Sequence, residues 1–227
     1  SELYATDIAK KNDRLTIGNL DLKPEKNNYF SLSAEYVHER FSVSVNAFYN
    51  NIRDMIDYNT IATGDKAMEQ YGHKEVRQRD NIAEAKVHGI NVSANAYLGA
   101  GFNLSGGYTH LNTQDVELEQ PIDKSIKNAY NINAQWAHSW KIYRLNINLN
   151  GRINSKRFSK SYGYAPEYQL WDLNTRHSFN LKSVIIEPGC GMENLFDYMD
   201  DRPYNSNYAT LTPGRSFYIS LSLKFKS

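Results

Sequence analysis

The chain has 227 residues, a length that allows one β-barrel or β-sandwich domain or two small domains. Lysine and arginine total 26 against 25 aspartate and glutamate, so the net charge of +1 gives no electrostatic footprint for nucleic acid. The absence of any run of about 18 apolar residues excludes a transmembrane helix, and the single cysteine, Cys190, excludes a disulfide framework within the chain.

The first ten residues, "SELYATDIAK", have neither the basic start nor the apolar core of a signal peptide. We therefore expect a chain that is mature or that starts within a longer protein. From residue 29 onward, apolar and polar residues alternate with period two, the pattern of strands that have one apolar and one polar face. Nine segments show it, in chain order 29–37, 41–50, 90–97, 102–108, 130–136, 143–150, about 168–180, 184–194 and 216–225.

The connections between these segments alternate between tight and long. Short turns are expected near 38–40, 98–101, 138–141 and 181–183, and long polar loops at 57–80, 113–124, 155–167 and 197–213. Only the segment 64–80 has room for a short helix. Short turns at one end and long loops at the other predict an up-and-down antiparallel sheet of successive hairpins, in a single domain spanning residues 1–227.

The polar face of the predicted strands is mainly serine and asparagine, as in the polar interior of a membrane barrel. The alternative is a soluble β-sandwich, whose solvent face is usually richer in lysine, glutamate and threonine. Aromatic residues gather at the short-turn end, where they would form an interfacial girdle. We therefore predict an all-β, antiparallel, up-and-down transmembrane β-barrel, with the apolar face and Cys190 toward lipid. The turn-end aromatic residues are Tyr36, Phe41, Tyr97, Phe102, Trp136, Trp140, Tyr143 and Phe225.

Three motifs, in order along the chain, resemble the C-terminal half of the barrel of TonB-dependent outer-membrane receptors. They are "GNLDLKPE" (18–25), "NIAEAKVHGINVSANAYL" (81–98) and "MENLFDYMDDRPY" followed by "TPGRSFYISLSLKF". Two departures are visible: Leu20 stands where the family commonly has proline, and Lys226 and Ser227 follow the terminal aromatic Phe225.

The resemblance implies that the nine strands are the C-terminal strands of a barrel of twenty-two, and that the plug domain and TonB box lie outside this chain. It implies a multi-pass protein of the Gram-negative outer membrane. Such a receptor imports a scarce nutrient, such as siderophore-bound iron, heme or a corrinoid, energised through TonB. The implied partners are lipid, the N-terminal barrel and plug part, and TonB, with or without a surface lipoprotein. A passive porin or structural barrel is the alternative.

Nine is an odd number of strands, so we expect that this piece does not close alone as an antiparallel barrel. Two unpaired sheet edges in lipid would leave backbone groups unsatisfied. The edge strands, near 29–36 and 217–225, should then pair with backbone from elsewhere.

The long loops supply the candidate ligand-binding residues, because aromatic and arginine side chains dominate binding hot spots. No cofactor, metal set or catalytic residue is predicted: no Gly-x-Ser-x-Gly motif and no His-x-x-x-His pair occurs. His73 or His110 as an axial heme ligand, and the Asp197, Asp200 and Asp201 group as a calcium site, are the alternatives to solvated loop and turn residues. The candidate residues are Tyr71, His73, Arg77, Tyr162 and Tyr164.

Overall fold

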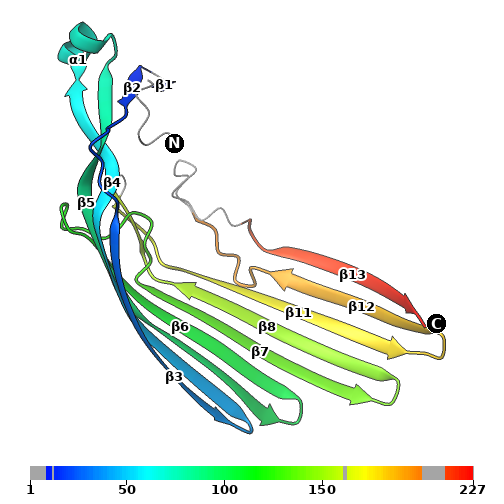
Figure 1. The fold of residues 1–227 in the computed structure, drawn as a ribbon. Helices are drawn as coiled ribbons and strands as arrows, with labels where there is room; N and C mark the ends of the chain where they lie inside the picture. Colours follow the sequence, from blue (N-terminus) through cyan, green and yellow to red (C-terminus); the bar gives the residue numbers. More distant parts are fainter. Residues whose placement is uncertain (1–8, 12, 161–162, 201–212, 227) are drawn as a thin grey trace. The chain divides into compact units, whose positions relative to one another are not determined.

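The computed structural model describes residues 9–11, 13–160, 163–200 and 213–226. These residues form thirteen strands and one helix (Figure 1). In chain order they are β1 (Ala9–Lys11), β2 (Arg14–Ile17), β3 (Lys26–His38), β4 (Phe41–Thr63), α1 (Gly64–Tyr71), β5 (Glu75–Gly99), β6 (Phe102–Asp115), β7 (Asn128–Trp140), β8 (Tyr143–Asn154), β9 (Arg157–Ser159), β10 (Gly163–Ala165), β11 (Tyr168–Asn180), β12 (Val184–Glu193) and β13 (Ser216–Phe225).

Nine of the strands are long, and they are the nine that the alternation predicts. They follow one another in the sheet in the order β3, β4, β5, β6, β7, β8, β11, β12, β13, so each pairs with its neighbours in sequence. Within the described residues, β3 pairs only with β4 and β13 only with β12. The predicted up-and-down sheet of successive hairpins is therefore confirmed, with β3 and β13 as its end strands.

The chain divides into two compact units. The first unit comprises residues 1–30, 49–87 and 113–121, and the second comprises 31–48, 88–112 and 122–227. The described part of the chain contains no helix with the length and apolar character needed to cross a bilayer.

In the second unit, the register keeps apolar residues opposite apolar residues across strands. Ala134 on β7 is opposite Leu104 on β6 and Leu149 on β8, whereas Asn133 is opposite Ser105 and Asn150. Residues directly opposite one another in an antiparallel pair lie on the same face of the sheet. Each hairpin therefore preserves the separation of an apolar from a polar face, because a slip of one residue would exchange the two.

Short connections close the hairpins at the predicted turn end, and two of them, β5–β6 and β7–β8, contain left-handed backbone. The β5–β6 turn runs through Gly99, Ala100 and Gly101, all with positive φ. Gly101 is also required by close packing, since a Cβ there would lie 2.0 Å from the carbonyl oxygen of Ala137.

The first unit holds a small apolar core beside the helix. Leu15 on β2, Ala67 on α1 and Val76 on β5 are buried together, and Tyr71 packs against them. Strand β2 pairs with β5 in parallel, with Leu15 opposite Val76. Helix α1 follows Thr63 and ends before Gly72, which has a left-handed backbone and donates its N–H to the carbonyl of Met68.

Two expected loops contain more regular structure than the sequence indicates. The connection expected at 57–80 is the outer part of β4, then α1, then the start of β5, so the helix allowed at 64–80 is present. The connection at 155–167 contains the short antiparallel pair β9–β10. The short strand β2, which is not one of the nine predicted strands, joins β5 in parallel.

Candidate functional site

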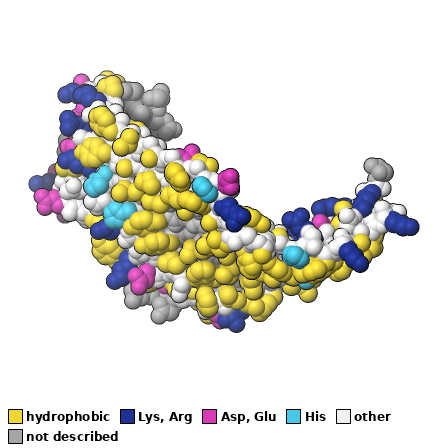
Figure 2. Space-filling model, turned by 90° about the horizontal axis from the view of Figure 1, so that it is seen from below, with side chains coloured by type: hydrophobic (Ala, Val, Ile, Leu, Met, Phe, Trp, Pro, Cys, Tyr) yellow, Lys and Arg dark blue, Asp and Glu magenta, His cyan; other side chains and the backbone are white. Residues whose placement is uncertain are grey.

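The apolar face of the second unit is exposed where a water-soluble protein would bury it. On β13, Ile219 is 88% exposed and Phe225 is 81% exposed. Figure 2 shows hydrophobic side chains side by side over much of one face of the molecule. Monomeric soluble proteins rarely expose contiguous apolar surface on this scale, so the face requires an apolar environment.

Aromatic rings form a continuous row on the apolar face at the turn end. Trp140 stacks on Tyr143 with ring centroids 5.5 Å apart, and Tyr143 lies 5.0 Å from Phe179. The Tyr143 hydroxyl lies 2.7 Å from Nδ1 of His177. His138, 4.4 Å from the Trp140 ring, belongs to the row. Rings with one apolar and one polar side suit the boundary between hydrocarbon and headgroups.

The polar face carries a ladder of hydrogen-bonded amides. Nδ2 of Asn133 donates to Oδ1 of Asn148 at 2.7 Å and to Oδ1 of Asn150 at 2.6 Å. On the next rung, Nε2 of Gln135 lies 3.4 Å from Oδ1 of Asn146. These amides therefore satisfy one another across strands on the polar face.

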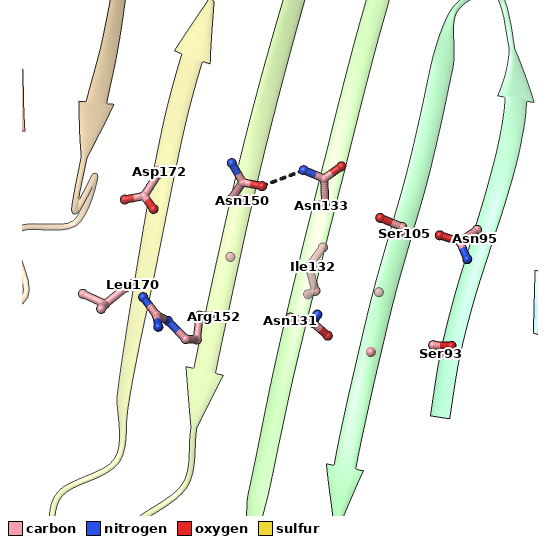
Figure 3. Close-up of a pocket in the computed structure, with 13 residues that line it drawn as sticks. Ser93, Asn95, Ser105, Asn131, Ile132, Asn133, Asn150, Arg152, Leu170 and Asp172 are labelled. Carbon is pink, nitrogen blue, oxygen red and sulfur yellow. Dashed lines mark hydrogen bonds between the residues drawn. The ribbon is translucent and has the colours of Figure 1, made fainter. Parts of the chain in front are cut away.

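A recess of about 460 Å³ opens on this polar face (Figure 3). Ser105 and Asn131 line one part of it, and Arg152 extends from β8 toward Leu170 and Asp172 on β11 (Figure 3). Oδ1 of Asp172 accepts a hydrogen bond from the backbone N–H of Asn194 at 2.9 Å. The recess therefore offers amide, hydroxyl and guanidinium groups to a polar occupant.

Three of the predicted ligand-binding residues fall in the first unit. Tyr71 contributes to the small apolar core, and His73 lies in the segment between α1 and β5. Nε of Arg77 forms an ion pair with the carboxylate of Glu75, which also binds Arg14 at 2.8 Å. The hydrogen bonds from Arg14 and Arg77 lower the pKa of Glu75 below its ordinary value of 4.5.

The other two candidates lie on the connection between β8 and β11. Tyr164, on β10, is 56% exposed and makes an edge contact with Phe158 at a centroid distance of 5.3 Å. Tyr162 lies outside the described residues. Tyr164 thus belongs to the second unit and Tyr71, His73 and Arg77 to the first.

One pair that the sequence pattern did not single out joins β5, close to Arg77, to β4. Arg79 donates from Nη2 to the Tyr58 hydroxyl at 2.9 Å, and its guanidinium carbon lies 4.7 Å from the centre of that ring. The alternation of Arg77 and Arg79 in "VRQRD" was the available signal for a cationic strip along β5.

The motifs that carry the family resemblance have structural roles. Asn194 is 4% exposed, and its side chain binds the backbone N–H and carbonyl of Tyr198 at 2.8 and 2.7 Å. Oδ1 of Asp197 accepts the N–H of Arg215 at 2.7 Å, which is turn chemistry. In "LKPE", a carboxylate oxygen of Glu25 accepts the N–H of Ile56 at 2.8 Å.

The structure gives no support to the alternative heme and calcium sites. Within the described residues, no group of three or more histidine, cysteine, aspartate or glutamate side chains could hold a metal ion. Nδ1 of His110 lies 2.8 Å from Oδ1 of Asn128. Asp201 lies outside the described residues.

Comparison with known proteins gives a consistent set of similarities. Residues 1–195 match the family described as TonB dependent receptor-like, beta-barrel. A curated relative, the probable TonB-dependent siderophore receptor PiuA of Acinetobacter baumannii, is 28% identical over 162 residues, which are 64% of this chain and 21% of that protein. The chain thus spans about a fifth of the length of this relative.

Solved structures show the same fold. A variant of the ferric enterobactin receptor PfeA of Pseudomonas aeruginosa, in complex with enterobactin, matches with a TM-score of 0.69 at 21% identity, covering 93% of this chain and 33% of that chain. The siderophore receptor PirA of Acinetobacter baumannii matches with a TM-score of 0.68 at 18% identity, with the same coverage of 93% and 33%.

Proposed function

This chain belongs to the TonB-dependent receptor β-barrel family, and from that membership we propose that it is the C-terminal barrel portion of a nutrient-import receptor. Members of the family are outer-membrane β-barrel proteins of Gram-negative bacteria, and this chain is a segment of such a barrel. The family consists of receptors rather than enzymes. The proposal extends to residues 1–227 as a single barrel portion, without the plug domain.

The observation that carries the membrane placement is the unbroken division of the sheet into two faces. Apolar partners such as Ala134 and Leu149 remain opposite each other while Asn133 and Asn150 share the other face. In hydrocarbon, every backbone polar group must be bonded within the protein, which a closed barrel achieves. We assign the apolar face to lipid and the amide-bearing face to the barrel interior.

We propose a siderophore–iron complex as the nutrient. The relative PiuA is named as a probable siderophore receptor, and the matching PfeA structure holds enterobactin, so this ligand class is that of those proteins. On this chain, Arg79 beside Tyr58 offers guanidinium and hydroxyl donors to the oxygen-rich shell of an iron chelate. Tyr71, His73, Arg77, Tyr162 and Tyr164 remain the proposed loop contacts. Heme and a corrinoid are the other nutrients proposed for such loops.

The proposed partners follow from the same role. The end strands β3 and β13 would pair with the N-terminal strands of the receptor barrel, and the interior would receive its plug. Energy would come through TonB, which would contact the plug part rather than this chain. Lipid would cover the apolar face, and a surface lipoprotein would assist capture if the nutrient is very bulky.

Uptake of iron-55 carried by a siderophore tests the proposal. The receptor gene that encodes residues 1–227 would be expressed in cells with and without TonB, with the empty vector as control. A receptor gives uptake that saturates at low ligand concentration and disappears without TonB. The passive porin alternative predicts unsaturated uptake that persists without TonB, and that result would reject active transport.

A second arm tests the assignment of domains. Residues 1–227 alone should give no TonB-dependent uptake, because within the described residues β3 and β13 are each paired along one edge only. Co-expression of the N-terminal part should restore it. Uptake by the isolated piece would contradict its assignment as a barrel portion.

A further inference from the structure

Another, smaller recess lies on the polar face of β8, β11 and β12. It is closer to the turn end than the recess in Figure 3. Its volume is about 280 Å³. The register places Arg144 opposite Ser178 and Arg176 opposite Asn146, so the two arginines are diagonal neighbours on one face of β8 and β11. Gly189, opposite Arg176 on β12, adds no side chain that would fill the space. The recess is lined by Arg144, Asn146, Arg176, Ser178 and Glu187.

The charges of this recess do not balance within the described residues. Its single carboxylate, Glu187, is already engaged, since Nζ of Lys224 lies 2.7 Å from one of its oxygens and Oγ of Ser178 lies 3.4 Å from the other. Both arginines are exposed, and neither lies within ion-pair distance of a described carboxylate. Arg176 is close enough to attract Glu187, but that carboxylate binds Lys224 directly. Once Lys224 is matched with Glu187, two positive charges remain.

Two adjacent guanidinium groups repel each other. A carboxylate between them removes the repulsion and satisfies the planar donors of each arginine in bidentate geometry. Asn146 and Ser178 add an amide and a hydroxyl at the same recess. The donor set thus suits an oxyanion, with more than one hydrogen bond available to each oxygen.

We propose that Arg144 and Arg176 bind an aspartate or glutamate side chain from a segment of the same receptor that lies outside residues 1–227 and docks against the polar face. This proposal rests on the proposed function, because that function places the polar face in the barrel interior. Charge complementarity selects an acidic segment. The solved receptors that this chain matches are about three times as long as the part covered, which leaves ample chain to supply it. Lipid phosphates are excluded as occupants, because they would meet the opposite, apolar face.

Photo-crosslinking in the full-length receptor, in cells, identifies the occupant. A benzophenone amino acid replaces Asn146, which lines the recess, and in the matched control it replaces Ile147, the next residue, on the apolar face. We expect the Asn146 position to crosslink to a peptide of the same polypeptide that contains aspartate or glutamate. The Ile147 position should not yield that peptide. No intramolecular crosslink, or one to a peptide without an acidic residue, would overturn the proposal.

Charge exchange tests the chemistry of the contact. Arg176→Glu should lower the thermal unfolding midpoint by about 3 °C or more, and replacing the crosslinked acidic residue by arginine in the same protein should restore it. Lys182→Glu, in the exposed β11–β12 turn, makes the same charge change and should shift the midpoint by about 1 °C or less. Equal shifts for Arg176→Glu and Lys182→Glu would contradict the contact.

A free anion is the competing occupant and has a separate signature. Inorganic phosphate would then raise the midpoint of the native receptor but not that of an Arg144→Gln/Arg176→Gln variant, and no acidic peptide would crosslink. That result overturns the proposal. The crosslink is read without transport, so its failure is distinguishable from a failure of the TonB-dependent uptake on which the function rests.

Discussion

Adjacent residues on β8 face different solvents. Leu149 is opposite Ala134 on the apolar face, and Asn148 is opposite Gln135 on the polar face. Leu149→Arg, near the middle of the strand, should destabilise the folded receptor by about 2–4 kcal/mol, because it places a charge in hydrocarbon. Asn148→Arg should cost about 1 kcal/mol or less, since its side chain stays in the aqueous interior. Equilibrium unfolding from lipid vesicles measures both.

Ile147 provides a depth control for this pair. It is opposite Trp136, which belongs to the aromatic row at the turn end, so it lies closer to the membrane boundary than Leu149. The cost of Ile147→Arg should therefore lie between those of Leu149→Arg and Asn148→Arg. Similar large costs at all three positions would instead support a sandwich with both faces buried.

Gly151 and Gly106 are matched glycines on the apolar face, because both lie opposite Ile132. A Cβ at Gly151 would lie 2.5 Å from the ring of Trp171, whereas one at Gly106 would meet only a carbonyl oxygen at 3.3 Å. Gly151→Ala must displace an indole that is also held by a hydrogen bond to Gln169 at 3.1 Å.

We therefore expect Gly151→Ala to destabilise the receptor by about 1–3 kcal/mol, the usual range for overpacking. Gly106→Ala should cost less than about 1 kcal/mol. Removing the indole should remove the overpacking. In a Trp171→Ala background, the further change Gly151→Ala should therefore cost little. Unfolding in lipid vesicles separates these variants, and equal costs for the two single glycine changes would contradict the steric account.

The candidate ligand-binding residues show how much of a site can be predicted from the sequence alone. Arg77 and Tyr164 could be recognised as arginine and aromatic residues of outer connections. That Tyr71 packs against Leu15 could not, because this contact depends on a parallel pairing between distant segments. The Arg79–Tyr58 pair was missed because both residues lie in the segment 57–80, which the sequence predicted as a loop rather than as parts of β4 and β5.

At the scale of elements, the attachment of β2 to β5 should depend on pH. Arg14 on β2 and Arg77 on β5 both bind Glu75 and lower its pKa below 4.5. A carboxylate whose pKa is lower in the folded than in the unfolded protein stabilises the fold at pH values above its unfolded pKa. This contribution disappears as the pH falls through its folded pKa. We expect β2 to detach more readily at a pH below the depressed pKa than at pH 6.

Hydrogen exchange measures this attachment. Protection factors of the β2 amides, corrected for the intrinsic effect of pH, should fall on acidification in the native protein. Glu75→Gln should show weaker protection at pH 6 and little further change in acid, because it has no charge to lose. The amides of β8 serve as an internal control. A Glu75→Gln protein with the native pH dependence would refute this assignment.

The strands that the sequence predicted are those whose two faces meet different solvents. Alternation along 143–150 and 216–225 was sufficient to place β8 and β13 within a few residues. The outer parts of β4 and β5 escaped prediction, because charged residues such as Arg53 and Asp54 interrupt the alternation where lipid no longer selects for it. The three-residue strands β9 and β10 depend on each other for pairing and leave too short a pattern to detect.

At the scale of the whole molecule, the alternation of short turns and long connections assigns the two sides of the membrane. We predict that the turns near 38–40, 98–101, 138–141 and 181–183 are periplasmic and that α1 is outside the cell. The prediction follows from the barrel rule that periplasmic turns are short and extracellular loops are long. The native thiol of Cys190 is exposed on the apolar face, so labelling requires its replacement by serine.

In that Cys190→Ser receptor, one cysteine is introduced at Asp65, in the first turn of α1, and in a second protein at Lys182, in the β11–β12 turn. A thiol reagent that does not cross the membrane should label the Asp65 position in intact cells. The Lys182 position should be labelled only after the outer membrane is opened. Both residues are polar, and the Lys182 turn carries no side chain assigned to a binding site, so both proteins should fold. Labelling of the Lys182 position but not the Asp65 position in intact cells would reverse the topology and move the proposed ligand residues to the periplasm, which would contradict their role in nutrient capture.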